Sequence, residues 1–138
     1  MNKRIAVLLS GRGSNFQSIL AASQSGTLGG QVGIVISNRP GAGGLDIARE
    51  AAIQTALIDH QSYESREAFD ADLAGVLESQ SPDLVVLAGF MRILTPGFVS
   101  RFAGRLMNIH PSLLPLYPGL QTHRRALDAG DSHAGATV

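Results

Sequence analysis

The chain has 138 residues, a length that is enough for one folded domain with its own core. Hydrophobic residues make up 44% and charged residues 16%, which is typical of a folded globular protein. Eleven basic and eleven acidic residues balance, and this argues against a surface built for nucleic acid or an anionic membrane. There is no cysteine, so disulfides and thiolate metal sites are excluded. The apolar runs are too short to span a bilayer, and no cleavage site follows the first of them, so we expect a cytoplasmic protein without a signal peptide.

Five short apolar runs predict β-strands. They cover residues 4–9, 31–37, 55–59, 83–89 and 105–110, and residues 133–138 resemble the start of another strand. The runs are continuous rather than strictly alternating, which is typical of strands in a sheet that is covered on both faces.

The segments between these runs predict helices over residues 15–23, 45–52, 65–79 and 122–130. In the third, Ser65 is a candidate N-cap, Glu67 suits the first turn, and a stripe of apolar residues follows: Ala68, Phe69, Leu73, Val76 and Leu77. Strand and helix alternate along residues 1–138. We therefore predict a single α/β domain with a Rossmann-like, mostly parallel sheet flanked by helices and joined by right-handed crossovers.

The loop "SGRGSN", residues 10–15, lies between the first strand and the first helix. Gly11 and Gly13 let the backbone turn sharply and approach a ligand, and Ser14 and Asn15 add polar donors. The free N–H groups at the start of a helix, together with its dipole, favour an anion.

This loop does not match a dinucleotide site, because Phe16 replaces the third glycine and Ser37 and Asn38, not an acid, close the second strand. A Walker A sequence does not occur either. A single phosphate fits best, although a tight turn without any ligand explains the loop equally well.

Asn108 and His110 lie two residues apart at the end of the fifth predicted strand, so their side chains should share one face. An amide can hold a carbonyl oxygen as it becomes an oxyanion, and an imidazole can transfer a proton near neutral pH. The four histidines show no metal-ligand spacing. The alternative is a buried polar pair that fixes the following loop.

The segment "AGFMRIL", residues 88–94, follows the fourth predicted strand. It is apolar except for Arg92 and could line a site for a flat, partly apolar ring. Ordinary packing with a surface arginine is the alternative.

Four stretches together, "SGRGSN", "SREAFD", "LAGFMRIL" and "NIHPSLLPLYPGLQTHRRAL", resemble the phosphoribosylglycinamide formyltransferase family along the whole chain. The resemblance implies formyl transfer from 10-formyltetrahydrofolate to the amine of 5-phosphoribosylglycinamide in purine biosynthesis, without a metal. It implies that Gly13, Ser14 and Asn15 bind the substrate phosphate. Folate-binding residues are implied at Arg66, Met91, Arg92, Ile93, Leu94 and Asn108. Asn108 would hold the formyl oxygen, and His110 would be the general acid.

Chains of this family continue past the equivalent of position 138 and supply an aspartate that orients the histidine. Asp128 and Asp131 do not match that aspartate. We therefore expect an N-terminal portion cut before the last strands, with little activity by itself. An exposed sheet edge would favour a homodimer.

Related interpretations stay open. Methionyl-tRNA formyltransferase and formyltetrahydrofolate deformylase share the second half of the pattern but not "GRGSN". A non-catalytic module that binds a phosphorylated metabolite is an alternative of another class.

Overall fold

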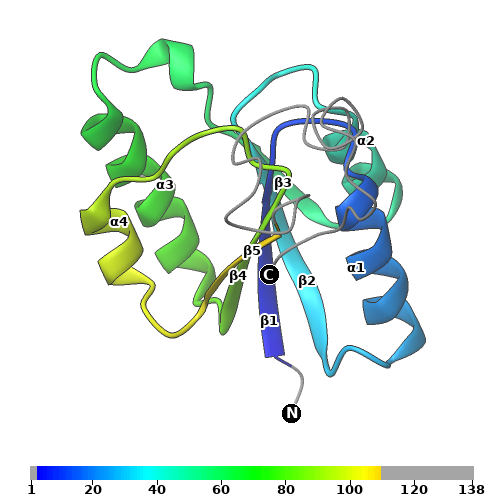
Figure 1. Ribbon diagram of the computed structural model, residues 1–138. Coiled ribbons are helices and arrows are strands. Elements are labelled where there is room, and N and C mark those ends of the chain that lie inside the picture. Colours follow the sequence, from blue (N-terminus) through cyan, green and yellow to red (C-terminus); the bar gives the residue numbers. More distant parts are fainter. Residues whose placement is uncertain (1–2, 110–138) are drawn as a thin grey trace, which may run out of the picture. The chain divides into compact units, whose positions relative to one another are not determined.

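The structure, a computed structural model, describes residues 3–109, which contain a five-stranded sheet in the order β3-β2-β1-β4-β5 (Figure 1). Its strands are β1 Lys3–Leu9, β2 Gly30–Ser37, β3 Gln54–Leu57, β4 Leu84–Ala88 and β5 Leu106–Ile109. The pairs β1–β2, β1–β4 and β2–β3 run parallel, and the register between β1 and β2 shifts by one residue between Ile5 and Ala6. All five predicted strands are confirmed to within two residues.

Helices cover both faces of this sheet (Figure 1). Helices α1 Ser14–Ser25 and α2 Gly43–Glu50 lie on one face, and α3 Arg66–Gln80 and α4 Pro96–Arg101 lie on the other. A short 3-10 helix, η1 His60–Ser62, precedes α3. The predicted Rossmann-like α/β class is therefore confirmed. The sequence reading missed α4 and η1, although Thr95 followed by Pro96 is a strong helix-start signal.

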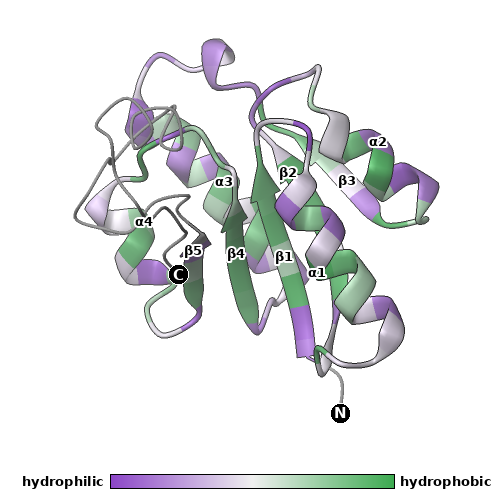
Figure 2. Cartoon of the chain, turned by 45° about the vertical axis from the view of Figure 1, so that its right-hand side comes forward, coloured by the Kyte–Doolittle hydropathy of each residue, from purple (hydrophilic) through white to green (hydrophobic). Residues whose placement is uncertain are grey.

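The core explains why the strands read as continuous apolar runs. Ala6 and Leu8 of β1 belong to the cluster formed with α3 and α4, while Val7 and Leu9 are equally buried on the opposite face. Successive side chains of a strand alternate between faces, so a sheet with helices on both sides needs apolar residues at every position. Strand β4 is accordingly green in Figure 2, and β1 is green beyond its hydrophilic start.

Helix α3 begins as predicted but buries a slightly different stripe. Ser65 accepts a hydrogen bond from the N–H of Ala68 at 3.1 Å, which confirms the N-cap. Ala68 is exposed, so the predicted stripe is wrong at this position, whereas Val76 is half-buried and packs against the core cluster. The buried residues are Phe69, Asp70, Leu73, Ala74 and Leu77.

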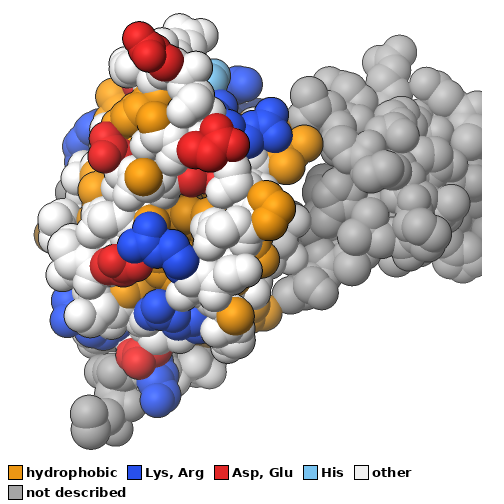
Figure 3. Space-filling model, turned by 90° about the vertical axis from the view of Figure 1, so that its left-hand side faces the viewer, with side chains coloured by type: hydrophobic (Ala, Val, Ile, Leu, Met, Phe, Trp, Pro, Cys, Tyr) orange, Lys and Arg blue, Asp and Glu red, His pale blue; other side chains and the backbone are white. Residues whose placement is uncertain are grey.

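The outer surface of α3 and α4 carries acidic and basic side chains scattered among apolar ones (Figure 3). One pair, Arg101 and Glu78, links the two helices at 2.5 Å, and both side chains are close to half-exposed. Exposed pairs add little stability, so the apolar cluster beneath holds these helices. Within residues 3–109, no helix has both the length and the hydropathy to cross a bilayer.

Residues 1–107 form one compact unit, and a second unit begins at Asn108. The helix predicted over residues 122–130, the strand predicted over 133–138, Asp128 and Asp131 lie outside the described residues. The prediction of one domain over residues 1–138 therefore stays a prediction.

Tyr63 closes the turn between η1 and α3. Its ring meets Phe69 edge-on, with centroids 5.6 Å apart, and its hydroxyl donates to Asp72 Oδ2 at 2.7 Å. This hydrogen bond, followed by burial and the nearby negative charge, raises the pKa of Tyr63.

This shift predicts a pH-dependent effect of Tyr63→Phe. A raised folded-state pKa means that the stabilisation is fully present below the unfolded tyrosine value of about 10 and is lost as pH rises through the folded value. We expect Tyr63→Phe to lower the free energy of unfolding by about 0.5 to 1 kcal/mol at pH 7. The difference from the native chain should shrink above about pH 10, as measured by urea unfolding at several pH values. A difference that does not change with pH would contradict the assignment.

Candidate active site

The strand order reverses between β1 and β4, because β1 pairs with β2 on one side and with β4 on the other. Open α/β sheets bind ligands at such a switch point, outside the carboxyl ends of the strands. Here the segment 10–13 leaves β1 and the segment 89–95 leaves β4. These two segments are the candidate site within residues 3–109.

Ser10 joins the two segments. Its N–H donates to the carbonyl of Gly89 at 3.1 Å, and its hydroxyl accepts the N–H of Met91 at 2.8 Å. The same hydroxyl donates to Asn38 Oδ1 at 2.5 Å. Ser10 and Asn38 are 4% and 2% exposed, so these hydrogen bonds form away from water, where a lost partner is costly.

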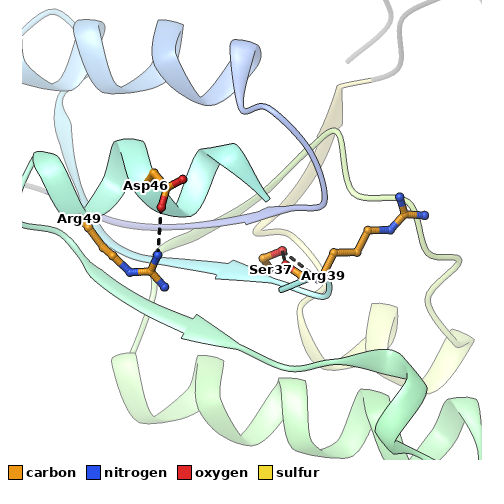
Figure 4. A network of polar contacts seen from close by, with 4 residues as sticks. All are labelled: Ser37, Arg39, Asp46 and Arg49. Carbon is orange, nitrogen blue, oxygen red and sulfur yellow. Dashed lines mark hydrogen bonds and ion pairs between the residues drawn. The ribbon is translucent and has the colours of Figure 1, made fainter. Parts of the chain in front are cut away.

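The end of β2 is fixed by a second set of polar contacts. His60 Nδ1 lies 3.1 Å from the carbonyl oxygen of Asn38. The Ser37 hydroxyl donates to the carbonyl of Arg39 at 2.8 Å and accepts the N–H of Arg39 at 3.0 Å. Figure 4 shows that the Arg39 side chain extends away from Ser37. The sequence reading noted Ser37 and Asn38 only because neither is acidic, and the structure gives both of them partners.

A separate ion pair in the same view, Asp46 with Arg49 at 3.2 Å on α2, has side chains 75% and 58% exposed (Figure 4). Such a pair is a surface feature of the helix and not a part of the site.

The predicted phosphate loop has the geometry of an uncapped helix start. Gly13 precedes α1 with φ of 80°, and no side chain caps the first turn. Gly11, Ser14 and Asn15 are exposed. The N–H groups of a first helical turn have no partner inside the helix, so they can donate hydrogen bonds to an anion. The partial positive charge at the start of the helix dipole would also attract that anion.

Gly13 is also a point of close approach between two helix starts. A Cβ atom on Gly13 would lie 2.8 Å from Cα of Gly44 on α2, and the N–H of Gly44 donates to the carbonyl of Gly11 at 3.1 Å. Neither position has room for a larger residue, since a Cβ on Gly44 would meet the Leu9 side chain. The glycines therefore allow the backbone to turn and also allow the starts of α1 and α2 to pack closely together.

The segment after β4 alternates between outward and inward side chains. Met91 and Ile93 are 51% and 74% exposed, whereas Phe90 and Leu94 pack against the core cluster. Arg92 is half-buried, with its guanidinium carbon 4.4 Å from the centroid of the Phe69 ring. The alternative of a surface arginine is therefore wrong, because the cation stacks on an aromatic ring, and a contact between Arg92 and folate stays a prediction.

The remaining predicted site residues are placed only in part. Arg66 is the first residue of α3 and is exposed, and Asn108 is exposed on β5. His110 lies outside the described residues, so the shared face of Asn108 and His110 stays a prediction. Among residues 3–109, no group of three or more His, Asp or Glu side chains could hold a metal ion.

Fold and site together define an open, parallel α/β protein. A glycine turn and an uncapped helix start follow its first strand, and the neighbouring loop exposes Met91 and Ile93. A formyl transferase family model matches residues 3–138. The chain belongs to the formyl transferase family.

Two curated relatives and a solved structure refine this placement. The chain is 53% identical over 134 residues to phosphoribosylglycinamide formyltransferase of Escherichia coli, covering 97% of the chain and 63% of that protein. It is 49% identical over 138 residues to the trifunctional purine biosynthetic protein adenosine-3 of Drosophila melanogaster, covering 99% of the chain and 10% of that protein. The structure of phosphoribosylglycinamide formyltransferase from Coxiella burnetii superposes with a TM-score of 0.94 at 48% identity, covering 99% of this chain and 64% of that one.

The resemblance inferred from the four sequence stretches is thereby confirmed. The chain spans just under two thirds of the length of the Escherichia coli and Coxiella burnetii relatives.

The geometry of the glycine loop, residues 10–15, predicts unequal effects of two glycine substitutions. Gly13 and Gly26 both have φ of 80°, but a Cβ on Gly26 would meet nothing within 4 Å. In both variants an alanine in the left-handed region destabilises the fold by about 1 to 2 kcal/mol. In Gly13→Ala the new Cβ also clashes with the backbone of α2, so α2 must shift. We expect Gly13→Ala to lose at least about 1 kcal/mol more than Gly26→Ala in denaturant unfolding. Equal losses would show that the approach of Gly44 does not constrain the loop.

Proposed function

We propose that this chain carries the phosphate-binding part and a portion of the folate-binding part of a phosphoribosylglycinamide formyltransferase. The reaction moves a formyl group from 10-formyltetrahydrofolate to the glycinamide amine of 5-phosphoribosylglycinamide. The names of the Escherichia coli and Coxiella burnetii relatives support this activity. The similarity to each relative covers nearly all of this chain.

The observation that carries the proposal is the bridge made by Ser10. A two-substrate transfer needs both ligands at one place, because holding reacting groups together removes much of the entropic barrier. Ser10 is bonded to Gly89 and Met91 and is followed at once by the glycine loop. The candidate phosphate site and the candidate folate segment are therefore joined by hydrogen bonds at one edge of the sheet.

The ribonucleotide phosphate is proposed to bind at Gly13, Ser14 and Asn15. The free first turn of α1 supplies N–H donors, and the exposed side chains of Ser14 and Asn15 supply more. A monophosphate suits a single helix start that lacks the third glycine of a dinucleotide loop.

The folate ring is proposed to lie against the segment from Met91 to Leu94, with Arg66 as a further contact. Met91 and Ile93 present apolar surface to solvent, which a flat pterin ring would cover. Arg66 is a natural partner for an anionic group of the folate, because its exposed guanidinium can bind a carboxylate with two hydrogen bonds.

The chemistry is assigned to Asn108 and His110. The substrate amine attacks the formyl carbon, a new C–N bond forms, and the bond from that carbon to the folate nitrogen breaks. Asn108 donates to the formyl oxygen as negative charge develops on it. His110 delivers a proton to the departing nitrogen, and the attacking amine loses a proton to water. No metal is required for these steps.

The location of the protein and its assembly belong to the same proposal. A biosynthetic enzyme of small, soluble substrates would work in the cytoplasm. A homodimer through a sheet edge stays a prediction, which sedimentation of the purified protein would test.

The assignment of the reacting groups predicts a large, selective loss of turnover. Asn108→Ala or His110→Ala, made in the full-length natural protein, should lower kcat by about 10²–10³ because one transition-state donor is removed. The melting temperature should stay close to that of the native protein. Turnover is measured as formyl transfer to 5-phosphoribosylglycinamide with 10-formyltetrahydrofolate as donor.

Gln24→Ala is the control, because it removes an exposed polar side chain near the far end of α1. Near-normal turnover in the Asn108 or His110 variant would remove that residue from the mechanism. A native protein that binds the ribonucleotide but no folate would point to a phosphate-binding module, and release of formate from the donor without transfer would point to a deformylase.

A further inference from the structure

The segment 89–95 has no helix or strand of its own, yet it carries most of the proposed folate contacts. A segment without internal hydrogen bonding keeps its shape only if other elements hold it. Two buried side chains do so, one at each end, and they come from different layers of the fold.

The first anchor is Ser10. Both functions of its hydroxyl are used, since it accepts from the N–H of Met91 and donates to Asn38. With the hydrogen bond from its own N–H to Gly89, Ser10 fixes the first residues of the segment. Because Ser10 is also the last residue before the glycine loop, any displacement of it reaches both proposed substrate sites.

The second anchor is Asp70, which reaches the other end of the segment from α3. Its Oδ2 accepts the N–H of Thr95 at 2.7 Å, and the residue is 4% exposed. Thr95 in turn caps α4, since its hydroxyl accepts the N–H of Phe98 at 3.3 Å. Asp70 therefore fixes the end of the segment and the start of the next helix together, at the opposite end of the segment from Ser10.

Asp70 stands in the buried stripe of α3, where the other four residues are apolar. Its second oxygen, Oδ1, is buried without a hydrogen-bond partner among residues 3–109. The same holds for Nε of Arg92, which lies in the segment that Asp70 anchors. Burying such groups unpaired destabilises a fold, so an apolar residue at position 70 would suit the core better. Packing alone does not explain why a carboxyl group is buried at this position, whereas its hydrogen bond with the N–H of Thr95 does.

We propose that Asp70 and Ser10 are positioning residues that set the shape of segment 89–95 for the formyl donor. The two differ in reach, because Asp70 acts on the donor site alone and Ser10 acts on both sites. This inference rests on the proposed function and assigns a role to the aspartate of "SREAFD", which the reaction itself does not use.

The test compares KM for the two substrates in variants of the full-length natural protein. Asp70→Ala should raise KM for 10-formyltetrahydrofolate about tenfold or more and leave KM for 5-phosphoribosylglycinamide within about twofold, since a hydrogen bond to a carboxyl group is lost at one site only. Asp70→Asn should restore most of the affinity, because its amide oxygen can still accept from Thr95. Ser10→Ala should raise both KM values.

Leu77→Val is the matched control, because it weakens the buried stripe of the same helix two turns away from Asp70. It should lower the melting temperature without changing either KM. Asp70→Val serves if Asp70→Ala does not fold, since it fills the buried position with an apolar side chain and still removes the acceptor. Hydrogen exchange gives an independent readout, because the Thr95 amide should exchange faster in the Ala or Val variant than in Asp70→Asn.

Equal rises of both KM values in Asp70→Ala, or a lowered kcat with both KM values unchanged, would overturn the role of Asp70. Unchanged KM values in Ser10→Ala would overturn the shared role of Ser10. A native protein that binds no formyl donor would instead refute the proposed function, and the exchange of the Thr95 amide would still report on the anchor.

Discussion

The hydroxyl of Ser10 is the contact on which the site depends. It lies where the strand order reverses, and it ties the end of β1 to the segment that leaves β4 and to Asn38 at the end of β2. Parallel strands bring their carboxyl ends to one edge but leave the loops there free to move apart. A buried hydroxyl that both donates and accepts turns three separate loop ends into one unit. This is the physical basis for the proposal that two substrates bind at that edge.

The sheet beneath is suited to hold such a unit steady. Apolar side chains cover both faces of β1, and helices pack on each side of it, so the strand cannot shift without opening two cores. Gly13 and Gly44 bring the starts of α1 and α2 into close contact on one side. On the other side, Asp70 links α3 to the start of α4. The loops of the site are therefore supported from both helical layers.

Sequence reasoning located most of these elements because their signals are local. Continuous apolar runs identified the strands, Ser65 identified the start of α3, and two glycines identified the turn after β1. It failed at Ala68, which is exposed although its spacing places it on the apolar stripe. The reason is that the spacing of apolar residues predicts a helix face but does not show which neighbouring element will cover each residue on that face. The glycine loop and the apolar segment were predicted for the same local reasons, and the family resemblance added proposed roles that spacing alone left open.

The sequence by itself determined the α/β class, the five strands within residues 3–109, the glycine turn and the family to which the chain belongs. Only the tertiary structure decided the strand order, and with it which loops meet. The hydrogen bond from Met91 to Ser10 joins residues 81 positions apart, and that from Thr95 to Asp70 joins residues 25 apart. Neither leaves a periodic signal, because a serine after a strand and an aspartate in a helix are ordinary residues until packing removes their water. Burial is what turns these two side chains into supports for the site, and burial is a property of the assembled layers.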